Sequence, residues 1–259
     1  MNIVILGYGN VAQHLVRAFS NTNEVTVSQL YNRSKIADPP IQNFTTSLSE
    51  LMDADVYIIA LPDDVIPDFS EKLPFENRLV VHTSGSVPLH LLSEKNNKGV
   101  FYPLQTFSED RVVDFTSIPI CIEATHGTDL STLKKLGDRI SEKVVEINSE
   151  QRRKLHLAAV FVNNFTNHLY HISEEIIKEN QLDFDLLKPL ILETAQKMNA
   201  LSPSQAQTGP AKRNDKKTIE NHLQLLNDAQ QNGSLDASVP ELYSMLTQSI
   251  LNKNHGKKL

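Results

Sequence analysis

The sequence has 259 residues, which is enough for one large domain or two smaller ones, and its 40% hydrophobic content is that of an ordinary globular protein. A formal net charge of −6 argues against a general nucleic-acid binder, and no apolar run reaches membrane-spanning length. The single cysteine, Cys121, excludes an internal disulfide, disfavours a cysteine-rich metal site and fits a reducing, cytoplasmic compartment.

The first twenty residues follow the pattern of a strand, a glycine-rich turn and a helix. Residues 2–6 are an apolar run, and a helix is expected over residues 13–19. The run between them, GYGNVA, matches the Gly-x-Gly-x-x-Ala turn that holds the pyrophosphate of a dinucleotide at a helix N-terminus. The alternative is a glycine turn that only joins strand to helix. The cofactor interpretation assigns contacts to Gly7, Tyr8, Gly9, Asn10 and Val11.

The end of the second expected strand indicates which nicotinamide cofactor is preferred. Residues 24–31 have the strand pattern, and Asn32, Arg33 and Ser34 follow. An acidic residue here would bind the ribose hydroxyls of NAD and repel an extra phosphate, but this chain has none. The guanidinium of Arg33 is suited to hold a phosphate by two parallel hydrogen bonds. The sequence therefore predicts NADP, with a solvated surface arginine as the alternative.

Strands and helices continue to alternate up to about residue 148. Short helices are expected over residues 47–52 and 129–140, and further strands over 55–61, 77–82, 99–107, 118–123 and 144–147. This alternation predicts an α/β fold with a doubly wound, mostly parallel Rossmann sheet, helices on both faces and right-handed crossovers.

Polar or turn-forming residues follow three of these strands. Ligands of doubly wound sheets bind outside the carboxyl ends of the strands. The residues expected beside the cofactor are therefore Leu61, Pro62 and Asp63 after one strand and Thr83 and Ser84 after the next. Gln105, near the end of the following strand, is expected at the substrate.

The chain changes character after residue 148. No strand is expected from there to the C-terminus, and long helices are expected over residues 150–179, 185–201 and 210–230 and from residue 238 onward, with a frayed tail from 252. The sequence thus predicts a dinucleotide-binding domain over 1–148 and an all-helical substrate and dimerisation domain over 149–259.

Polar residues flank the most apolar part of the first long helix. Residues 157–162 are apolar on every face, so burial is expected. At about 100° per residue, His156, Asn163 and Asn167 fall within roughly 20° of one another, with Asn164 on one flank. We interpret His156 as a proton donor, Asn164 as a group that orients a substrate carbonyl or imine, and Asn163 as a substrate contact. The alternative is structural: the amides bind a loop and the histidine covers buried surface. The histidines lack the His-Glu-x-x-His spacing, so no metal is predicted.

A second turn combines glycine, proline and basic residues. The segment TGPAKR at residues 208–213 resembles a helix N-terminus with a positive tip, and Gly209 and Arg213 are candidate contacts to an anionic substrate. The alternative is a plain turn with proline at the first helical position.

Six motifs in order resemble one known family. They are GYGNVA, IIALPDDVI, VVHTSGSV, FYPLQTFS, HLAAVFVNNF and TGPAKRND, and together they span almost the whole chain. The set resembles the proteins that join a Rossmann-like domain to a DUF2520 domain, which are similar to pyrroline-5-carboxylate reductase, the β-hydroxyacid dehydrogenases and the coenzyme F420-dependent NADP oxidoreductases. The resemblance implies a helical domain like the carboxy-terminal part of 6-phosphogluconate dehydrogenase and a homodimer formed through it.

The resemblance does not carry over the catalytic pair of the β-hydroxyacid dehydrogenases. Those enzymes use a lysine with an asparagine one turn later on this helix. Here Lys154 is followed four residues on by Ala158, and His156 by Val160. A reductase built on this chain would therefore use His156 with Asn164 instead.

The leading hypothesis is an NADP-dependent oxidoreductase that moves a hydride between nicotinamide and a small carbonyl, hydroxy or imine compound. Its partners would be a small-molecule substrate and a second copy of the chain, with no nucleic acid and no membrane. A pyrroline-5-carboxylate-type imine reductase is one alternative. A non-catalytic NADP-binding sensor or adaptor is the other.

Overall fold

The computed structural model describes residues 1–255. The chain forms two compact units, one over residues 1–163 and one that begins at Asn164. Each unit is described here by itself. No helix among the described residues is both long and apolar enough to pass through a lipid bilayer.

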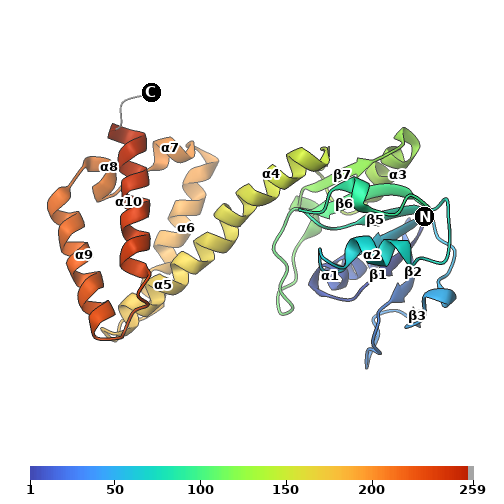
Figure 1. The fold of residues 1–259 in the computed structure, drawn as a ribbon, viewed down its shortest axis with the longest axis horizontal. Coiled ribbons are helices and arrows are strands. Elements are labelled where there is room, and N and C mark those ends of the chain that lie inside the picture. Colours follow the sequence, from blue (N-terminus) through green and yellow to red (C-terminus); the bar gives the residue numbers. More distant parts are fainter. Residues whose placement is uncertain (256–259) are drawn as a thin grey trace. The chain divides into compact units, whose positions relative to one another are not determined.

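The first unit is built on one mostly parallel sheet, as predicted, and this sheet has eight strands where seven were expected. Its strand order is β3-β2-β1-β4-β5-β6-β7-β8, and the strands from β3 to β6 are parallel, which is the doubly wound Rossmann arrangement (Figure 1). The bounds are β1 Asn2–Leu6, β2 Thr26–Tyr31, β3 Phe44–Thr45, β4 Val56–Ile59, β5 Leu79–His82, β6 Asn97–Pro103, β7 Ile120–Ala124 and β8 Val144–Glu146.

One local prediction in this unit was wrong: the helix expected over residues 47–52 is only one 3-10 turn, η1 (Leu48–Glu50), because Leu51 is already extended on the way to β4. The sheet is mostly parallel, as expected, and the exception is β7, which runs antiparallel to β6. The connection between β6 and β7 contains only the short turn η3 (Phe115–Ser117), and a parallel pair needs a longer crossover, usually a helix.

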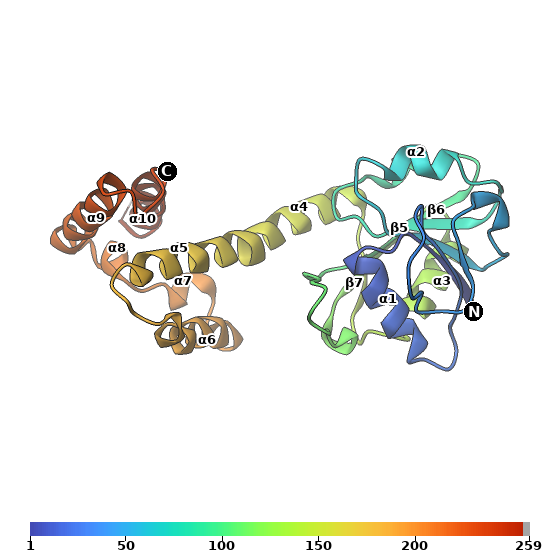
Figure 2. The ribbon, with the colours of Figure 1, turned by 90° about the horizontal axis from the view of Figure 1, so that it is seen from below.

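Helices cover both faces of the sheet. On one face, α1 (Asn10–Ser20) and α3 (Gly127–Gly137) pack against the strands, and α2 (Ile66–Glu71) packs on the other face (Figure 2). The strands β1 and β4 between them are almost completely buried, as expected for central strands of a parallel sheet.

The helix α4 (Ser149–Ala159) packs on the same face as α2, over β6 and β7. Asn148 caps it with a reciprocal pair of hydrogen bonds to Gln151. Leu155 then packs with Tyr102 and Cys121 on the sheet. This packing brings the middle of α4 close to the ends of the strands.

After α4 the helical backbone changes its hydrogen-bonding pattern. The segment η4 (Val160–Phe165) is π-helical, and α5 (Thr166–Lys178) follows. A π-helix has more residues per turn than an α-helix, so the predicted alignment of His156 with Asn163 and Asn167 at 100° per residue does not apply.

The predicted burial of residues 157–162 was wrong. Leu157, Phe161 and Val162 are each more than half exposed, and Val162 is 75% exposed. Apolar side chains favour contact with other apolar groups, but the described part of this chain leaves these side chains largely exposed to solvent.

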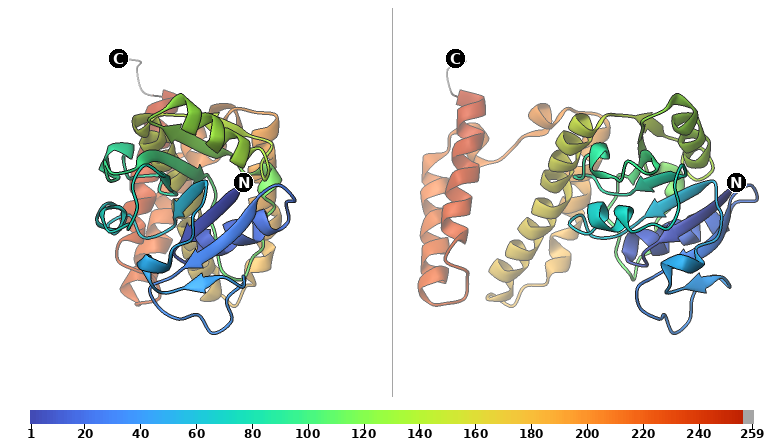
Figure 3. Two further views of the ribbon diagram at one scale, coloured as in Figure 1. Left: turned by 90° about the vertical axis from the view of Figure 1, so that its right-hand side faces the viewer. Right: turned by 45° about the vertical axis from the view of Figure 1, so that its right-hand side comes forward.

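The second unit is helical throughout its described part, as predicted. Its elements after α5 are η5 (Phe184–Leu186), α6 (Lys188–Gln196), η6 (Lys197–Asn199), α7 (Pro203–Ala206), α8 (Pro210–Arg213), α9 (Lys216–Gln231) and α10 (Val239–His255). α9 and α10 lie side by side as a hairpin (Figure 3). Leu226 of α9 and Val239 of α10 form a small buried core together with Ile172 of α5.

Three helix bounds in the second unit differ from the prediction. The helix expected over residues 185–201 is α6 flanked by two 3-10 turns, and a left-handed residue, Asn214, divides the helix expected from 210 into α8 and α9. The tail from 252 was expected to fray, but α10 continues to His255, and residues 256–259 lie outside the described part.

Candidate active site

The turn after β1 has the geometry that a bound dinucleotide requires. Gly7 has a φ of +108°, and a Cβ there would lie 2.5 Å from the carbonyl oxygen of Ala60, so only glycine fits. Gly9 is the N-cap residue of α1, no side chain caps the helix there, and a Cβ on Gly9 would meet no atom within 4 Å. The first-turn amides of α1 and the open space at Gly9 therefore fit a phosphate group.

The end of β2 presents one cation near this turn. The amide of Gly7 donates to the carbonyl of Tyr31, the last residue of β2, at 2.8 Å. Asn32 uses its side-chain amide to bond the carbonyl of Ser34 at 2.9 Å, which shapes the loop. Arg33 between them is exposed, and among the described residues its guanidinium has neither a carboxylate within ion-pair distance nor a hydrogen-bond partner. These residues fit a cofactor that carries an additional phosphate.

The register of the sheet brings the other predicted cofactor residues to the same edge. Leu6 pairs with Tyr31 and Ile59, and Ile59 pairs with His82, so the residues that follow these strands share the carboxyl edge. This edge carries Leu61, Pro62 and Asp63 after β4, with Pro62 and Asp63 exposed, and Thr83 and Ser84 after β5.

Side chains build the turn after β5. The hydroxyl of Ser84 accepts hydrogen bonds from the amides of Ser86 at 3.0 Å and Val87 at 2.9 Å, and the amide of Ser84 donates to Nδ1 of His82 at 3.1 Å. The oxygen of Ser84, a predicted cofactor ligand, is thus occupied in shaping the turn, and its own hydrogen remains to donate.

His82 is a fully buried, neutral histidine under this turn. Burial, with a smaller contribution from the cation of Arg152, lowers the pKa of His82 from 6.5 to about 3. Because Nδ1 accepts from Ser84, the ring hydrogen is on Nε2, which is buried without a partner among the described residues. His82 is therefore suited to holding the turn and not to exchanging protons.

The predicted proton donor, His156, lies against the same turn. Its Nδ1 is 3.1 Å from the hydroxyl of Tyr102 on β6, and the two rings meet edge to face with centroids 6.0 Å apart. A Cβ on Gly85 would lie 2.6 Å from Nδ1 of His156, so the glycine allows the close approach. His156 is half-buried and belongs to the carboxyl edge of the sheet, like the cofactor residues.

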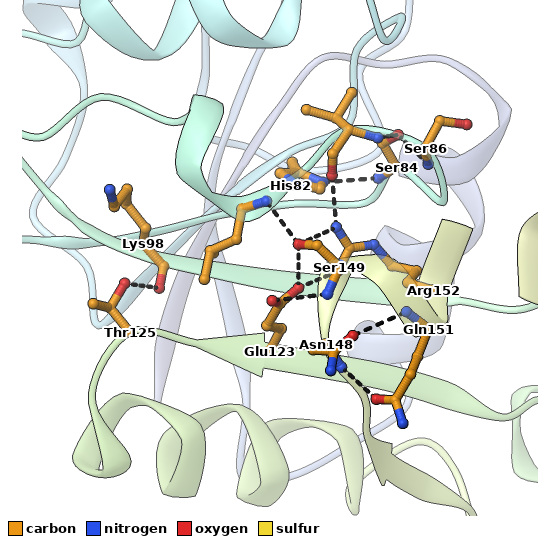
Figure 4. Close-up of polar contacts among 12 residues, drawn as sticks. His82, Ser84, Ser86, Lys98, Glu123, Thr125, Asn148, Ser149, Gln151 and Arg152 are labelled. Atoms are coloured by element: carbon orange, nitrogen blue, oxygen red, sulfur yellow. Dashed lines mark hydrogen bonds and ion pairs between the residues drawn. The ribbon is translucent and has the colours of Figure 1, made fainter. Parts of the chain in front are cut away.

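A buried ion pair fixes α4 beneath His156 (Figure 4). Arg152, one turn before His156, is completely buried and forms a salt bridge with Glu123 on β7. It also donates to the carbonyl of Val87 at 2.6 Å and to the hydroxyl of Ser149 at 3.2 Å. Ser149 in turn donates to Glu123 through its amide at 2.9 Å and its hydroxyl at 2.8 Å. One guanidinium thus joins the helix, the sheet and the turn after β5.

A cleft of about 500 Å³ opens beside His156. It combines a histidine, a hydroxyl from Ser86 and apolar surface, which is the mixture typical of small-molecule sites. The lining residues are Ser86, Glu150, Arg153, Lys154, His156, Leu157 and Val160.

The other predicted substrate residues are placed elsewhere. The side chain of Gln105 is exposed and its amide oxygen accepts from the amide of Thr106 at 2.8 Å. Asn163 is the last residue of the first unit, while Asn164 begins the second. Gly209 has a φ of +102° at the start of α8, and Arg213 ends that helix, both in the second unit.

Sequence reasoning missed three residues of this arrangement. Tyr102 lies inside an apolar strand, where the pattern indicates an ordinary core residue. Arg152 lies in the polar run QRRK, which is typical of a solvated surface. Gly85 is part of the small-residue turn in the motif VVHTSGSV. The short spacing of His82, Ser84 and Gly85 was the only local signal, since the remaining contacts join residues far apart in the chain.

Among residues 1–255, no group of three or more histidine, cysteine or carboxylate side chains is arranged to hold a metal ion. The structure thus brings together a glycine turn that fits a phosphate, an exposed arginine and a histidine paired with a buried tyrosine, all in the first unit.

The comparisons with known proteins agree with this arrangement. Residues 2–85 match the model of the family described as NADP oxidoreductase, coenzyme F420-dependent, and residues 118–250 match the domain of unknown function DUF2520. A crystal structure of a Bacteroides fragilis protein described as a candidate NADP oxidoreductase is 38% identical, with a TM-score of 0.83, over 97% of this chain and 98% of that chain. No curated protein matches the sequence.

Two more distant structures share the fold. An imine reductase from Myxococcus stipitatus in complex with NADP+ is 12% identical, with a TM-score of 0.68, over 99% of this chain and 96% of that chain. A pyrroline carboxylate reductase from Plasmodium falciparum with NADP bound is 14% identical, with a TM-score of 0.56, over 97% and 98% of the two chains.

Proposed function

Because the chain belongs to the family that joins an NADP oxidoreductase domain to a DUF2520 domain, we propose that it is an NADP-dependent oxidoreductase acting on a small carbonyl, hydroxy or imine compound. The observation that carries the proposal is the shared carboxyl edge. The uncapped turn at Gly9, the exposed Arg33 and the half-buried His156 all belong to that edge of one sheet.

Each part of the cofactor has residues suited to hold it. The amides at the start of α1 would bind the pyrophosphate, and Arg33, with Asn32 and Ser34 beside it, would bind the 2′-phosphate. Pro62 and Thr83, after β4 and β5, would lie toward the nicotinamide half. When bound, NADPH supplies the hydride that reduces a carbonyl or imine carbon.

The chain's own contribution to the reaction is a proton. In the reducing direction the imidazolium of His156 gives the hydrogen on Nε2 to the substrate oxygen or nitrogen, and solvent restores it. In the oxidising direction the neutral ring accepts that proton. The cleft beside His156 and Ser86 would hold the substrate.

The Arg33→Ala variant is expected to raise the Kd for NADPH by about 10- to 100-fold and to leave the Kd for NADH unchanged. Charge-assisted bonds to a phosphate are worth roughly 1.5–3 kcal/mol, and only NADPH carries the 2′-phosphate. Fluorescence titration of both nucleotides measures this. Lys72→Ala, which removes an equal charge at the end of α2, is the matched control.

If neither nucleotide binds the unchanged protein, the proposed function is wrong. If NADPH binds, its oxidation is then followed with a panel of small ketones, keto acids and cyclic imines. Faster turnover of cyclic imines than of ketones would favour an imine reductase within the proposed class. Binding of NADPH without turnover of any compound would favour a sensor or adaptor instead.

We also propose that the protein is a homodimer in which the helical unit supplies the interface. Monomeric proteins seldom leave many large apolar side chains exposed, yet several in the second unit are more than half exposed: Leu186, Leu190, Leu192, Leu225 and Met245. Sedimentation at micromolar concentration is expected to give the mass of two chains. A single-chain mass over the whole concentration range would contradict this proposal.

The buried state of Cys121, the only cysteine, supports a cytoplasmic location.

A further inference from the structure

We infer that Tyr102 is a positioning residue that holds His156 in the tautomer with its hydrogen on Nε2. The inference rests on the proposed function for the reaction it serves, but the hydrogen bond can be tested without any cofactor or substrate. Tyr102 is on β6 and His156 is on α4, 54 residues apart in the chain, and their polar atoms are 3.1 Å apart.

The burial of Tyr102 fixes the direction of this hydrogen bond. Tyr102 is only 8% exposed and packs with Cys121 and Leu155, so its hydroxyl hydrogen needs an acceptor within the protein. Among the described residues, Nδ1 of His156 lies within hydrogen-bond distance of that hydroxyl. The phenol therefore donates to Nδ1, and the hydrogen of the neutral imidazole is on Nε2.

The electrostatic surroundings keep Tyr102 protonated. Burial, with smaller contributions from the nearby Cys121 and Asp63, raises the pKa of Tyr102 to about 12, although the cation of Arg152 acts in the opposite direction. The phenol thus stays neutral near pH 7. It donates to neutral His156 and accepts from Nδ1 when the ring is charged, so it supports both protonation states of the proton donor.

Packing restricts the ring of His156 on two sides. Tyr102 meets it edge to face, and Gly85 allows the turn after β5 to lie directly against it, while Arg152 anchors the helix one turn earlier. A ring flip would move Nδ1 away from the phenol and leave a buried hydroxyl without its partner, which is unfavourable. The arrangement thus selects Nε2 as the nitrogen that exchanges protons.

The test is the Tyr102→Phe variant, which keeps the aromatic ring and removes only the hydroxyl. Tyr57→Phe is the matched control, because Tyr57 is equally buried on β4 and donates to the carbonyl of Met52 at 2.8 Å, away from His156. The ring nitrogens of His156 are measured by ¹⁵N NMR at a pH where the ring is neutral, and their signals are assigned by their loss in His156→Gln.

The expected result is that the unchanged protein and Tyr57→Phe carry the hydrogen of His156 on Nε2, while Tyr102→Phe shows a mixture of both tautomers. Equal tautomer populations in all three proteins would overturn the inference. Failure to bind NADPH would contradict the proposed function and would leave this NMR result unchanged, so the two failures are distinguishable.

Kinetics supply a second measurement. With a compound that the unchanged protein reduces, Tyr102→Phe is expected to lower kcat by about three- to tenfold, with KM and the Kd for NADPH unchanged. A purely structural role would instead lower thermal stability in both tyrosine variants and leave kcat of the folded protein intact. That outcome would also overturn the inference.

Discussion

The His156→Ala variant is expected to lower kcat by about 10²- to 10⁴-fold while the Kd for NADPH stays unchanged. Removal of a positioned general acid has an effect of this size, because the proton must then come from water. His156 lies on α4, whereas the phosphate-binding turn belongs to β1 and α1, so the cofactor contacts stay in place. Nucleotide titration and NADPH oxidation on the same protein sample measure both quantities.

The control for this variant is His126→Ala. His126 is also a histidine at a helix in the first unit, but it is exposed and its side chain caps nothing. It is expected to retain the turnover of the unchanged protein. Full turnover by His156→Ala would remove the proton-donor role. Loss of NADPH binding in that variant would show that His156 serves the cofactor instead.

The Arg152→Met variant is expected to destabilise the first unit by about 3–5 kcal/mol. Methionine has a similar length but no charge, so Glu123 would keep a negative charge in a mostly buried position without its partner. The carbonyl of Val87 and the hydroxyl of Ser149 would also lose a hydrogen-bond donor. Urea unfolding, followed by hydrogen exchange of the amides in β6 and β7, measures the change.

The neighbouring variant Arg153→Met provides the control for stability. Arg153 is exposed on the same helix turn, and its substitution is expected to change the free energy of unfolding by less than about 0.5 kcal/mol. Adding Glu123→Gln to Arg152→Met is expected to restore part of the loss, because the uncompensated charge is removed. Equal stabilities for the Arg152 and Arg153 variants would show that the buried pair contributes little.

The glycine turn of the candidate cofactor site could be predicted as local structure because its signals are local. The strand before Gly7, the glycines of the turn and the helix after them lie within twenty residues, and each follows from backbone conformation or hydrophobic periodicity. The place of Arg33 follows from the same unit, since it lies directly after the next strand. The order of the parallel strands then brings both to one edge.

The proton-transfer half could be predicted only in part. His156 stood out as a polar residue beside an apolar run, but its partner Tyr102 looks like an ordinary core residue in a strand. Arg152 looks like a solvated charge. Both roles depend on α4 packing over β6 and β7, and no periodicity within either segment reports such a contact.

The burial predicted for residues 157–162 was wrong for a physical reason. Their apolar composition favours contact with other apolar groups, but hydrophobicity does not say which chain supplies that contact. The direction of β7 is also not written in its own residues, because it depends on the connection before it, which has too little helix to form a crossover. The local sequence pattern predicts whether a segment is a helix or a strand, whereas the segments that pack beside it are determined by long-range contacts.

The anchoring of α4 by Arg152 has an evolutionary consequence. The guanidinium binds the sheet through Glu123 and the turn after β5 through Val87, so the spacing between His156 and the carboxyl edge of the sheet is determined within residues 1–163. Residues of the helical unit are then free to diverge in a lineage built on this chain without disturbing that spacing.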